Sequence, residues 1–391
     1  MPMKRNTVFS QLMQLICQYR FKKCVDRYDG DRYAKRFSCW QQLLVLLFAQ
    51  AKGLTSLRDI EVSLRSHHRK WYHLGLTSVA RSTLADANTN RDADILKEVF
   101  YSLLEKCRDL APRHRFRFKK ELYTFDSTLV NVCLSLYPWA TYRKKKGAFK
   151  LHTLFDHSGY LPSFVVLTDG RTHDINVMKD SPYGVPALSP DSILLVDRAY
   201  IDYNWLYSLT NSKLYFVTRM KKNMKYTVLG QQKLSKKNGV VSDYQVRLAN
   251  YYQSRYYPLP LRLVTVVDPE TGEHITFMTN NFALNATTIA ELYKSRWQIE
   301  TFFKWIKQNL KIKSFLGTSK NAVMTQIWAA MIYYLMLSFI KFQTKCRHSL
   351  HELTRIISEL LLDNTHLIEF IGVTLNAYAK VKRKQVQLSL F

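Results

Sequence analysis

Residues 292–307 read Leu-Tyr-Lys-Ser-Arg-Trp-Gln-Ile-Glu-Thr-Phe-Phe-Lys-Trp-Ile-Lys. In an α-helix each residue advances by about 100°, so this stretch predicts a helix on which four polar residues share an arc of roughly 60°. These residues are Tyr293, Arg296, Glu300 and Lys307. An apolar stripe on the adjacent arc predicts that one side of the helix enters a core. The polar face then holds a carboxylate between cations, which suits a metal-binding acid beside a phosphate backbone.

An ordinary salt-bridged surface helix would show the same spacing, so the carboxylates upstream matter. Asp126 lies in the alternating run 122–130, which predicts a strand, although taken alone it could equally cap a turn. Asp197 ends the apolar run 192–197, which is typical of a central strand buried on both faces. A buried carboxylate without a partner is costly, which favours a functional role for Asp197.

The order of predicted elements brings these acids together. Further strands are predicted at 148–156, 160–168 and 213–219, with a helix at 200–209 and a hairpin turn at 157–159. This order is that of a ribonuclease-H-like core interrupted before its last catalytic helix. The first and fourth strands are neighbours in such a sheet, so Asp126 and Asp197 are expected to meet, with Glu300 approaching from the helix.

Three carboxylates without histidine or cysteine ligands form a hard oxygen site that suits Mg²⁺ or Mn²⁺. Two such ions, about 4 Å apart, can activate a water or a 3′-hydroxyl and stabilise the leaving oxygen of a phosphodiester. We therefore expect Asp126, Asp197 and Glu300 to be the catalytic residues and to bind two divalent ions.

The composition points to a nucleic-acid partner. The 391 residues include 58 Lys and Arg against 30 Asp and Glu, which gives a net charge of +28. An excess of this size favours a polyanion, and no compact amphipathic basic helix indicates a membrane surface. The chain is 47% hydrophobic, which argues against disorder. Its six cysteines form no Cys-x-x-Cys pair, which argues against a zinc ribbon and fits a reducing cytosol.

The chain divides into five predicted segments. We expect a helical N-terminal domain that binds DNA, a first core part, a β-rich insertion, a second core part with the Glu300 helix, and C-terminal helices with a basic tail. Their bounds are 1–112, 113–219, 220–283, 284–345 and 346–391. Within the fourth segment, the apolar run 323–340 contains polar residues and is interpreted as a buried core helix rather than a membrane span. The segment 67–72, His-His-Arg-Lys-Trp-Tyr, either touches DNA or forms a solvated turn that anchors Trp71 in the core.

These blocks resemble a known family. Tyr293-x2-Arg296-x3-Glu300-x6-Lys307 matches the Tyr-Arg-Glu-Lys signature of DDE transposases of bacterial insertion sequences, the group called the IS-four family. The blocks Tyr-Thr-Phe-Asp126-Ser-Thr and Asp197-Arg-Ala-Tyr are similar to the family's first two acidic blocks, with Ala199 where many members carry Gly. By blocks, the resemblance covers roughly residues 120–345.

The resemblance implies an α/β fold with a ribonuclease-H-like core and a β-rich insertion between the second Asp and the Glu. It implies that Asp126, Asp197 and Glu300 bind the metals and that Tyr293, Arg296 and Lys307 contact DNA phosphates near the cleaved end. Related enzymes cut through a DNA hairpin, which needs a displaced base and a stacking aromatic. Trp297 is near enough in the sequence to be considered as this stacking aromatic. Its position on the predicted helix, about 40° around the axis beyond Tyr293, favours plain packing instead.

The expected activity is that of a transposase. It would bind the inverted repeats at the ends of a mobile element, join them as an oligomer that is a dimer in the synaptic complex, cut, and transfer 3′-hydroxyls into target DNA. It would act in the bacterial cytoplasm, on the nucleoid, and not at a membrane. Two alternatives are an inactive or domesticated DNA-binding protein and a metal-dependent nuclease without strand transfer.

Other basic groups are expected to contact phosphates and to make binding strongly salt-dependent. One cluster follows the first strand and comprises Arg143, Lys144, Lys145, Lys146 and Lys150; another comprises Lys221, Lys222 and Lys225. The last five residues resemble the peptide by which bacterial replication proteins bind the sliding clamp, through Gln387, Leu388, Leu390 and Phe391. The alternative is a tail that docks on the protein's own core.

Overall fold

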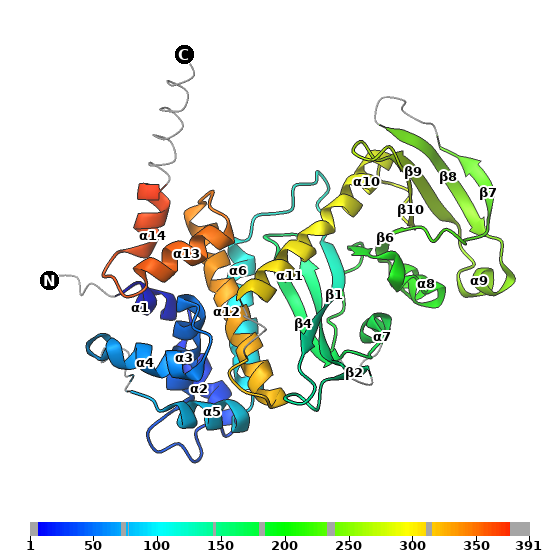
Figure 1. Cartoon of the computed structure of the whole chain (residues 1–391). Coiled ribbons are helices and arrows are strands. Elements are labelled where there is room, and N and C mark those ends of the chain that lie inside the picture. The colour runs from blue at the N-terminus through cyan, green and yellow to red at the C-terminus, as the bar shows by residue number, and fades with distance from the viewer. Residues whose placement is uncertain are drawn as a thin grey trace. The chain divides into compact units, whose positions relative to one another are not determined.

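The computed structural model describes residues 7–71, 76, 78–143, 146–179, 184–232, 239–309 and 315–375. The chain forms two compact units, coloured by residue number in Figure 1. The helical unit comprises Met1–Pro112, Val132–Trp139 and Lys304–Phe391, and the sheet unit comprises Arg113–Asn131 and Ala140–Phe303.

Helices make up the described part of the helical unit. They are α1 (Val8–Met13), α2 (Gln18–Arg27), α3 (Cys39–Lys52), α4 (Leu57–Ser66), α5 (Arg81–Asn90), α6 (Asp94–Leu110), α12 (Lys320–Thr344), α13 (Leu350–Leu360) and α14 (Leu367–Glu369), which continues as a π-helix over Phe370–Leu375. A 3-10 turn, His68–Lys70, precedes Trp71.

Helix α12 is the core of this unit. By length and composition it could cross a membrane, but 89% of its most apolar window is buried, and it packs against α3, α5, α6 and α13. The prediction of a buried core helix over 323–340 is confirmed. Its apolar surface is covered by other helices, which accounts for the hydropathy without a bilayer.

Local signals set the ends of several helices. Ser38 and Gln41 form a capping box at the start of α3, and Gly53 ends it in the left-handed conformation at φ 68°. Ser56 caps α4, since its side chain accepts a hydrogen bond from the Asp59 N–H. The chain turns between α1 and α2. Ile16 is turned into the core there, and its N–H bonds only three residues back, to Met13.

The segment around Trp71 anchors the core. Trp71 is 1% exposed, donates its indole N–H to the Leu64 carbonyl, and packs edge-on against Phe9 and Phe48. The interpretation of this segment as a solvated turn anchoring Trp71 is confirmed for the described residues. Tyr72 lies outside them.

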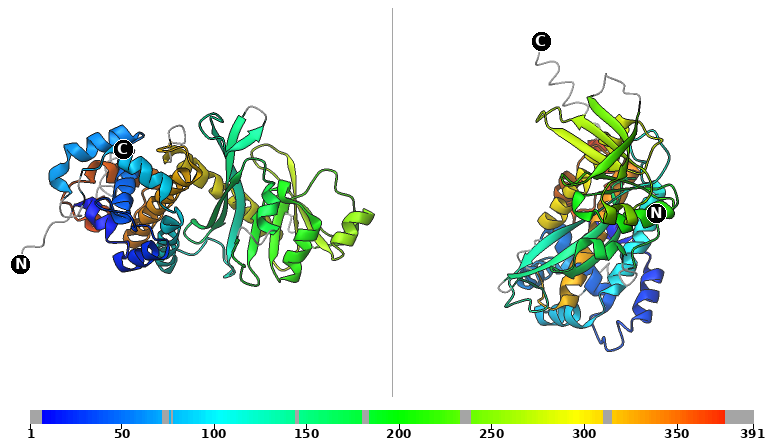
Figure 2. Two further views of the ribbon diagram at one scale, coloured as in Figure 1. Left: turned by 90° about the horizontal axis from the view of Figure 1, so that it is seen from below. Right: turned by 90° about the vertical axis from the view of Figure 1, so that its right-hand side faces the viewer.

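The sheet unit is built on one ten-stranded sheet of the described residues, whose strands run side by side in Figures 1 and 2. The strands are β1 (Leu122–Val132), β2 (Thr141–Arg143), β3 (Lys146–Asp156), β4 (Leu161–Asp169), β5 (Ile193–Val196), β6 (Tyr215–Arg219), β7 (Tyr226–Gln231), β8 (Val240–Leu248), β9 (Leu261–Val267) and β10 (His274–Thr279). The helices are α7 (Asp174–Lys179), α8 (Tyr203–Asn211), α9 (Tyr251–Tyr256), α10 (Ala286–Ser295) and most of α11 (Trp297–Asn309), with a 3-10 turn at Arg198–Tyr200.

The strand order is β2-β3-β1-β5-β6-β10-β9-β8-β7. Strand β4 lies off this path and pairs with β3. Strands β5 and β6 run parallel to β1, whereas β3 and β4 form an antiparallel hairpin. The expectation that the first and fourth predicted strands, β1 and β5, are neighbours is confirmed. The short strand β2 was not predicted.

Beyond β6 the sheet continues through strands that come later in the chain. Strands β9 and β10 form a hairpin, and Gly272 at φ 71° completes its turn. Strands β7 and β8 form a second antiparallel pair in the segment predicted to be β-rich. Strand β8 carries Asp243, whose carboxylate pairs with Arg262 of β9 at 2.7 Å, with both side chains buried.

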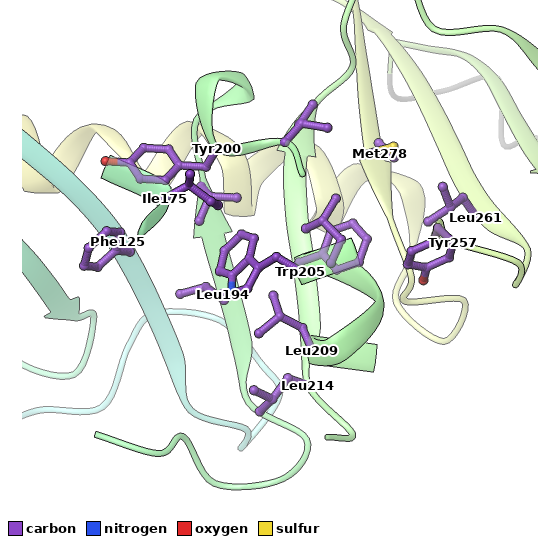
Figure 3. Close-up of a cluster of buried hydrophobic side chains, with 14 of the residues drawn as sticks. Phe125, Ile175, Leu194, Tyr200, Trp205, Leu209, Leu214, Tyr257, Leu261 and Met278 are labelled. Atoms are coloured by element: carbon purple, nitrogen blue, oxygen red, sulfur yellow. The ribbon is translucent and has the colours of Figure 1, made fainter. Parts of the chain in front are cut away.

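Alternate residues of the central strands enter two different cores, as expected for a sheet covered on both faces. Leu194 and Phe125 pack with α8 on one face, where Trp205 and Leu209 lie over them (Figure 3). Ile193 and its neighbours pack with α10 on the other face. This covering explains why the β5 sequence is apolar throughout and why polar side chains appear only where the strand ends.

His157, which follows β3, is a buried histidine in the described chain. It is 2% exposed, and its Nε2 lies 2.7 Å from the Thr124 hydroxyl in a hydrogen bond. Burial, then the charges of His114 and Arg115, lower the pKa of His157 from 6.5 to about 3. The folded protein holds this imidazole neutral, whereas the unfolded chain takes up a proton below about pH 6.5.

We expect His157 to lower the free energy of unfolding by about 1.4 kcal/mol for each pH unit below 6.5, until it titrates near its folded value. His157→Gln keeps an amide group for Thr124 and has no titrating group, so its stability should depend less on pH in this window. Urea unfolding at about pH 7.5 and 5 measures both proteins, with His152 unchanged in each. Equal pH slopes for the two proteins would contradict a neutral His157.

Candidate active site

The sheet itself brings Asp126 and Asp197 together. In the parallel pairing of β1 with β5, Phe125 lies opposite Val196, and the same register continued by one position sets Asp126 beside Asp197. Neighbouring strands lie about 4.8 Å apart. Both acids follow buried residues and are half-buried themselves; Asp197 directly follows the end of β5, whereas Asp126 lies within β1. Asp197 also accepts the Ala199 N–H at 3.0 Å and so caps the 3-10 turn.

The signature stretch forms two consecutive helices, α10 and α11, so the prediction of a single helix is corrected. They meet at Arg296, which keeps right-handed helical geometry. Ser295 donates its hydroxyl to the Leu292 carbonyl at 2.7 Å, which is the acceptor that the Arg296 N–H would take in a regular helix. The Arg296 N–H bonds to Tyr293 instead, which tightens the turn.

Arg296 connects two of the predicted acids. One guanidinium nitrogen lies 3.0 Å from the Asp126 carboxylate, and the other lies 2.9 Å from Glu300. Arg296 thus reaches β1, whereas Glu300 is connected to β1 only through Arg296, whose side chain is 14% exposed. The guanidinium stands where a metal cation would neutralise the same carboxylates.

The three acids influence one another electrostatically. Burial, and then the negative charges of Asp197 and Glu300, raise the pKa of Asp126 to about 6 against the lowering effects of the Ser127 N–H and Arg296. Below about pH 6 the protonated form of Asp126 therefore prevails, unless a further cation beside it favours the ionised form. This is the condition that a divalent cation would relieve.

The chemical type of the candidate ligands suits a divalent metal, because all of them are carboxylate oxygens. The present spacing is wider than a metal site requires: among the described residues, no three acidic, histidine or cysteine side chains lie close enough to hold an ion. Arg296 lies between Asp126 and Glu300 and keeps them apart. The acids would therefore have to close in as the guanidinium withdraws.

Tyr200 is a residue of this site that the sequence prediction missed. Its ring is 2% exposed and lies edge-on to Phe125, and its hydroxyl points away from Trp205 at the margin of the cluster in Figure 3. Burial and the charges of Asp126 and Asp174 raise the pKa of this phenol. The phenol therefore stays protonated beside Asp126. The only sequence signal was its place in the second acidic block, three residues after Asp197.

Tyr293 and Trp297 line a cavity on the other side of Arg296. The cavity measures about 760 Å³ and is also lined by Arg219, Phe277 and Lys294. Tyr293 packs against Phe277 with ring centres 4.9 Å apart, and the Arg296 guanidinium lies 5.7 Å from its ring. Trp297 is 57% exposed, so the expectation of plain packing is wrong. The break at Arg296 precedes this residue and leaves its indole at the cavity's rim.

The other predicted cations differ in their surroundings. Lys307 is exposed on α11, beyond the last residue of the sheet unit. Arg143 ends β2 and Lys146 is exposed at the start of β3, whereas Lys144 and Lys145 lie outside the described residues. Lys150 is held inside the unit by Asp174 at 2.9 Å and by the Thr172 carbonyl at 2.8 Å.

Lysines at the start of the predicted insertion also differ. Lys221 donates to the Ile201 carbonyl, whereas Lys222 and Lys225 are exposed. The residues of the expected clamp peptide, Gln387, Leu388, Leu390 and Phe391, lie outside the described residues.

Comparisons with known proteins agree with the sequence blocks. Residues 117–336 match a family described as "Transposase DDE domain", and residues 4–77 match a domain of unknown function (DUF4372). The chain is 36% identical over 264 residues to the putative transposase y4zB of Sinorhizobium fredii, covering 66% of this chain and 71% of that protein. It is 32% identical over 276 residues to a probable transposase for insertion sequence element IS5377 of Geobacillus stearothermophilus, covering 69% and 70%.

A solved structure is also similar in part. It is titled "Cryo-EM structure of piggyBac transposase synaptic complex with hairpin DNA" and aligns with a TM-score of 0.43 at 12% identity, covering 92% of this chain and 78% of that one.

Proposed function

Because this chain belongs to the DDE transposase family, we propose that Asp126, Asp197 and Glu300 are its three catalytic carboxylates. The chain is an enzyme of the transposase class and catalyses DNA transposition. The observation that carries the assignment of the acids is the pair of contacts from Arg296 to Asp126 and Glu300, with Asp197 beside Asp126 in the register of the sheet.

Asp126, Asp197 and Glu300 would hold the divalent metal on which enzymes of this class depend, and we propose Mg²⁺ or Mn²⁺, two ions in all. When bound, such ions activate the attacking oxygen and neutralise charge on the leaving oxygen of the phosphodiester. The chain contributes the fixed geometry of β1 and β5 and the partly buried surroundings of Asp126. Tyr200 stays protonated behind Asp126 and can donate a hydrogen bond toward the carboxylates.

Arg296 serves two purposes in this proposal. Without DNA it neutralises Asp126 and Glu300, which would otherwise repel each other. When DNA is bound, Arg296 would turn toward a phosphate near the cleaved end. A guanidinium can form bidentate hydrogen bonds with phosphate oxygens, as it does with carboxylate oxygens. Tyr293, and Lys307 further along α11, would contact phosphates of the same strand.

The cavity beside Arg296 suits a displaced nucleotide. Trp297 offers an exposed indole face for stacking, and Arg219 and Lys294 offer cations for the adjoining phosphates. Cleavage through a hairpin, with a base held in this cavity, is therefore the excision route that we propose.

The domain assignment rests on the strand order. Strands β4, β3, β1, β5 and β6 would form a ribonuclease-H-like core, and residues 220–283 would form an insertion, since β7 to β10 come between β6 and α10 in the chain. We propose that residues 1–112 bind DNA, that 284–345 complete the core and that 346–391 follow it. The enzyme would act as a dimer on two element ends in the bacterial cytoplasm, and its tail would bind the sliding clamp.

A plasmid that carries the DNA flanking the gene tests this function. Purified protein with Mg²⁺ should release the element and yield products joined to a second plasmid, and chelation with EDTA should abolish both steps. Gel analysis followed by sequencing of the junctions distinguishes the candidates. Cleavage without joined products would favour a nuclease, and binding without cleavage would favour an inactive DNA-binding protein.

A further inference from the structure

The part of the sheet unit farthest from the acids has an unusual charge distribution. Between Asp202 and Asp268 the sequence contains one acidic residue, Asp243, among many cations. The charge of Asp243 is taken up by Arg262, and both side chains are at most 5% exposed. The surface of this segment therefore presents positive charge without a compensating carboxylate of its own.

The fold gathers exposed cations of this segment at one edge of the sheet. Strand β7 pairs with β8 so that Thr227 lies opposite Arg247, and the Ala249 N–H donates to the Lys225 carbonyl at 3.0 Å. Helix α9 follows at once and carries Arg255. Lys225, Arg247 and Arg255 are all exposed, and in the described parts of the chain none of them has an ion-pair partner.

Tyrosines lie among these cations. Tyr251 and Tyr252 on α9 are 73% and 70% exposed, Tyr256 is 52% exposed, and Tyr226 at the start of β7 is 38% exposed. Single exposed aromatic residues need no explanation. Here, four tyrosines and three unpaired cations occupy adjoining elements, and such a set offers many donors and no acidic group. We call these seven residues the α9 patch.

The patch lies away from the acids in two directions. Five strand spacings of about 4.8 Å separate β5 from β7 in the order of the sheet, which is roughly 24 Å across the sheet, and α9 lies beside β7 in Figure 1. Strand β7 also runs parallel to β5, so the patch at the start of β7 lies at the opposite end of the strands from Asp197, which follows the end of β5.

We propose that the α9 patch binds the phosphate backbone of duplex DNA at a distance from the phosphate held at the acids. This inference rests on the proposed function of Asp126, Asp197 and Glu300. The cations would neutralise phosphates, and the tyrosine hydroxyls would donate hydrogen bonds to phosphate oxygens, contacts that fix the position of a duplex without reading its sequence. Strand β7 is also an unpaired and uncharged edge, so pairing with a second copy of the chain is the competing outcome of the test.

The test compares two sets of variants with a matched control. The cation variant is Lys225→Gln, Arg247→Gln and Arg255→Gln together. The hydroxyl variant is Tyr251→Phe, Tyr252→Phe and Tyr256→Phe together, which keeps the rings. The control, Lys320→Gln, Arg347→Gln and Arg355→Gln, removes the same charge from exposed positions of the helical unit.

Fluorescence anisotropy with a labelled duplex of the element end gives the affinity at several salt concentrations. The cation variant should bind at least about tenfold more weakly near 0.1 M salt, and the slope of log affinity against log salt should fall by about 2 to 3. The hydroxyl variant should bind more weakly with an unchanged slope. The control should change the slope by less than about 0.5.

Cation and hydroxyl variants that bind like the control would overturn the proposal. Variants that bind duplex DNA normally but no longer form a dimer in analytical sedimentation would also overturn it. That result would show that the β7 edge pairs with a second copy of the chain. Cleavage measured at saturating protein distinguishes the proposal about the α9 patch from the proposal about the catalytic acids. The patch variants should still cleave, whereas a wild-type protein that binds duplex through the patch without cleaving would refute only the catalytic assignment.

Discussion

Asp126→Asn is expected to lower the rate of end cleavage by at least about a thousandfold, because groups that act as one catalytic unit lose most of their effect when one is removed. The amide has the same shape but no charge, so it cannot hold a cation as the carboxylate does. Glu300→Gln should have an effect of similar size. Cleavage of a labelled element end, measured in single turnover with Mg²⁺, gives both rates.

The same variant should keep its fold. The pKa of Asp126 is raised to about 6 by burial, so the folded state prefers the protonated acid. The favourable contribution of Asp126 is present below its ordinary value of about 3.8 and is lost as the pH rises toward 6. At pH 7.5 the asparagine should therefore be tolerated, and its free energy of unfolding should be at least that of the wild type.

Asp191→Asn is the matched control for this experiment. Asp191 lies just before β5, at the opposite end of that strand from Asp197, and its φ of 70° is readily adopted by asparagine. Its cleavage rate should stay within about twofold of the wild type. Near-normal cleavage by Asp126→Asn, or a loss of DNA binding as large as the loss of cleavage, would show that Asp126 is not a catalytic carboxylate.

Arg262→Met should lower the free energy of unfolding by about 3 to 5 kcal/mol, which is the effect of leaving one member of a buried ion pair alone. Arg262 contacts both carboxylate oxygens of Asp243, at 2.9 and 2.7 Å, and also donates to the carbonyls of Asn281 and Leu284. Its loss would leave a charge and two carbonyls buried without partners. Urea unfolding at neutral pH measures the change.

A double replacement shows whether the pair itself is stabilising. Asp243→Leu combined with Arg262→Met removes both charges and should recover most of the lost stability, because apolar residues of similar size often replace a buried pair at little cost. Arg65→Met breaks the exposed pair with Glu61 on α4 and should change stability by less than about 1 kcal/mol. A loss as small for Arg262→Met as for Arg65→Met would mean that Asp243 finds another partner or is protonated.

Much of the sheet was predictable, because its signals are local. The apolar run that became β5 and the turn residues between β9 and β10 each specify a strand or hairpin within a few neighbours. The helix around Glu300 followed in the same way from its periodicity. The break at Arg296 did not, because periodicity does not report that the Arg296 N–H bonds to Tyr293 while the Ser295 hydroxyl donates to the Leu292 carbonyl.

The candidate site was predictable as a set of residues but not as an arrangement. Residue type, spacing and the order of elements indicated Asp126, Asp197 and Glu300. Nothing in the sequence indicated that Arg296 would lie between two of them, or that Tyr200 would bury its ring beside Asp126. Lys150 resembled its neighbours in a basic run, yet its ion pair with Asp174 turns it inward.

The sequence by itself determined the family, the choice of the three acids as candidates, the positive charge that favours a nucleic-acid partner, and the strands and helices with strong local patterns. The tertiary structure decided the pairing of β1 with β5, the bridge made by Arg296, and the gathering of Lys225, Arg247 and Arg255 at one edge. The reason is physical. Periodicity and turn chemistry act over a few residues, whereas ion pairs, strand register and burial depend on groups that the chain brings together from far apart.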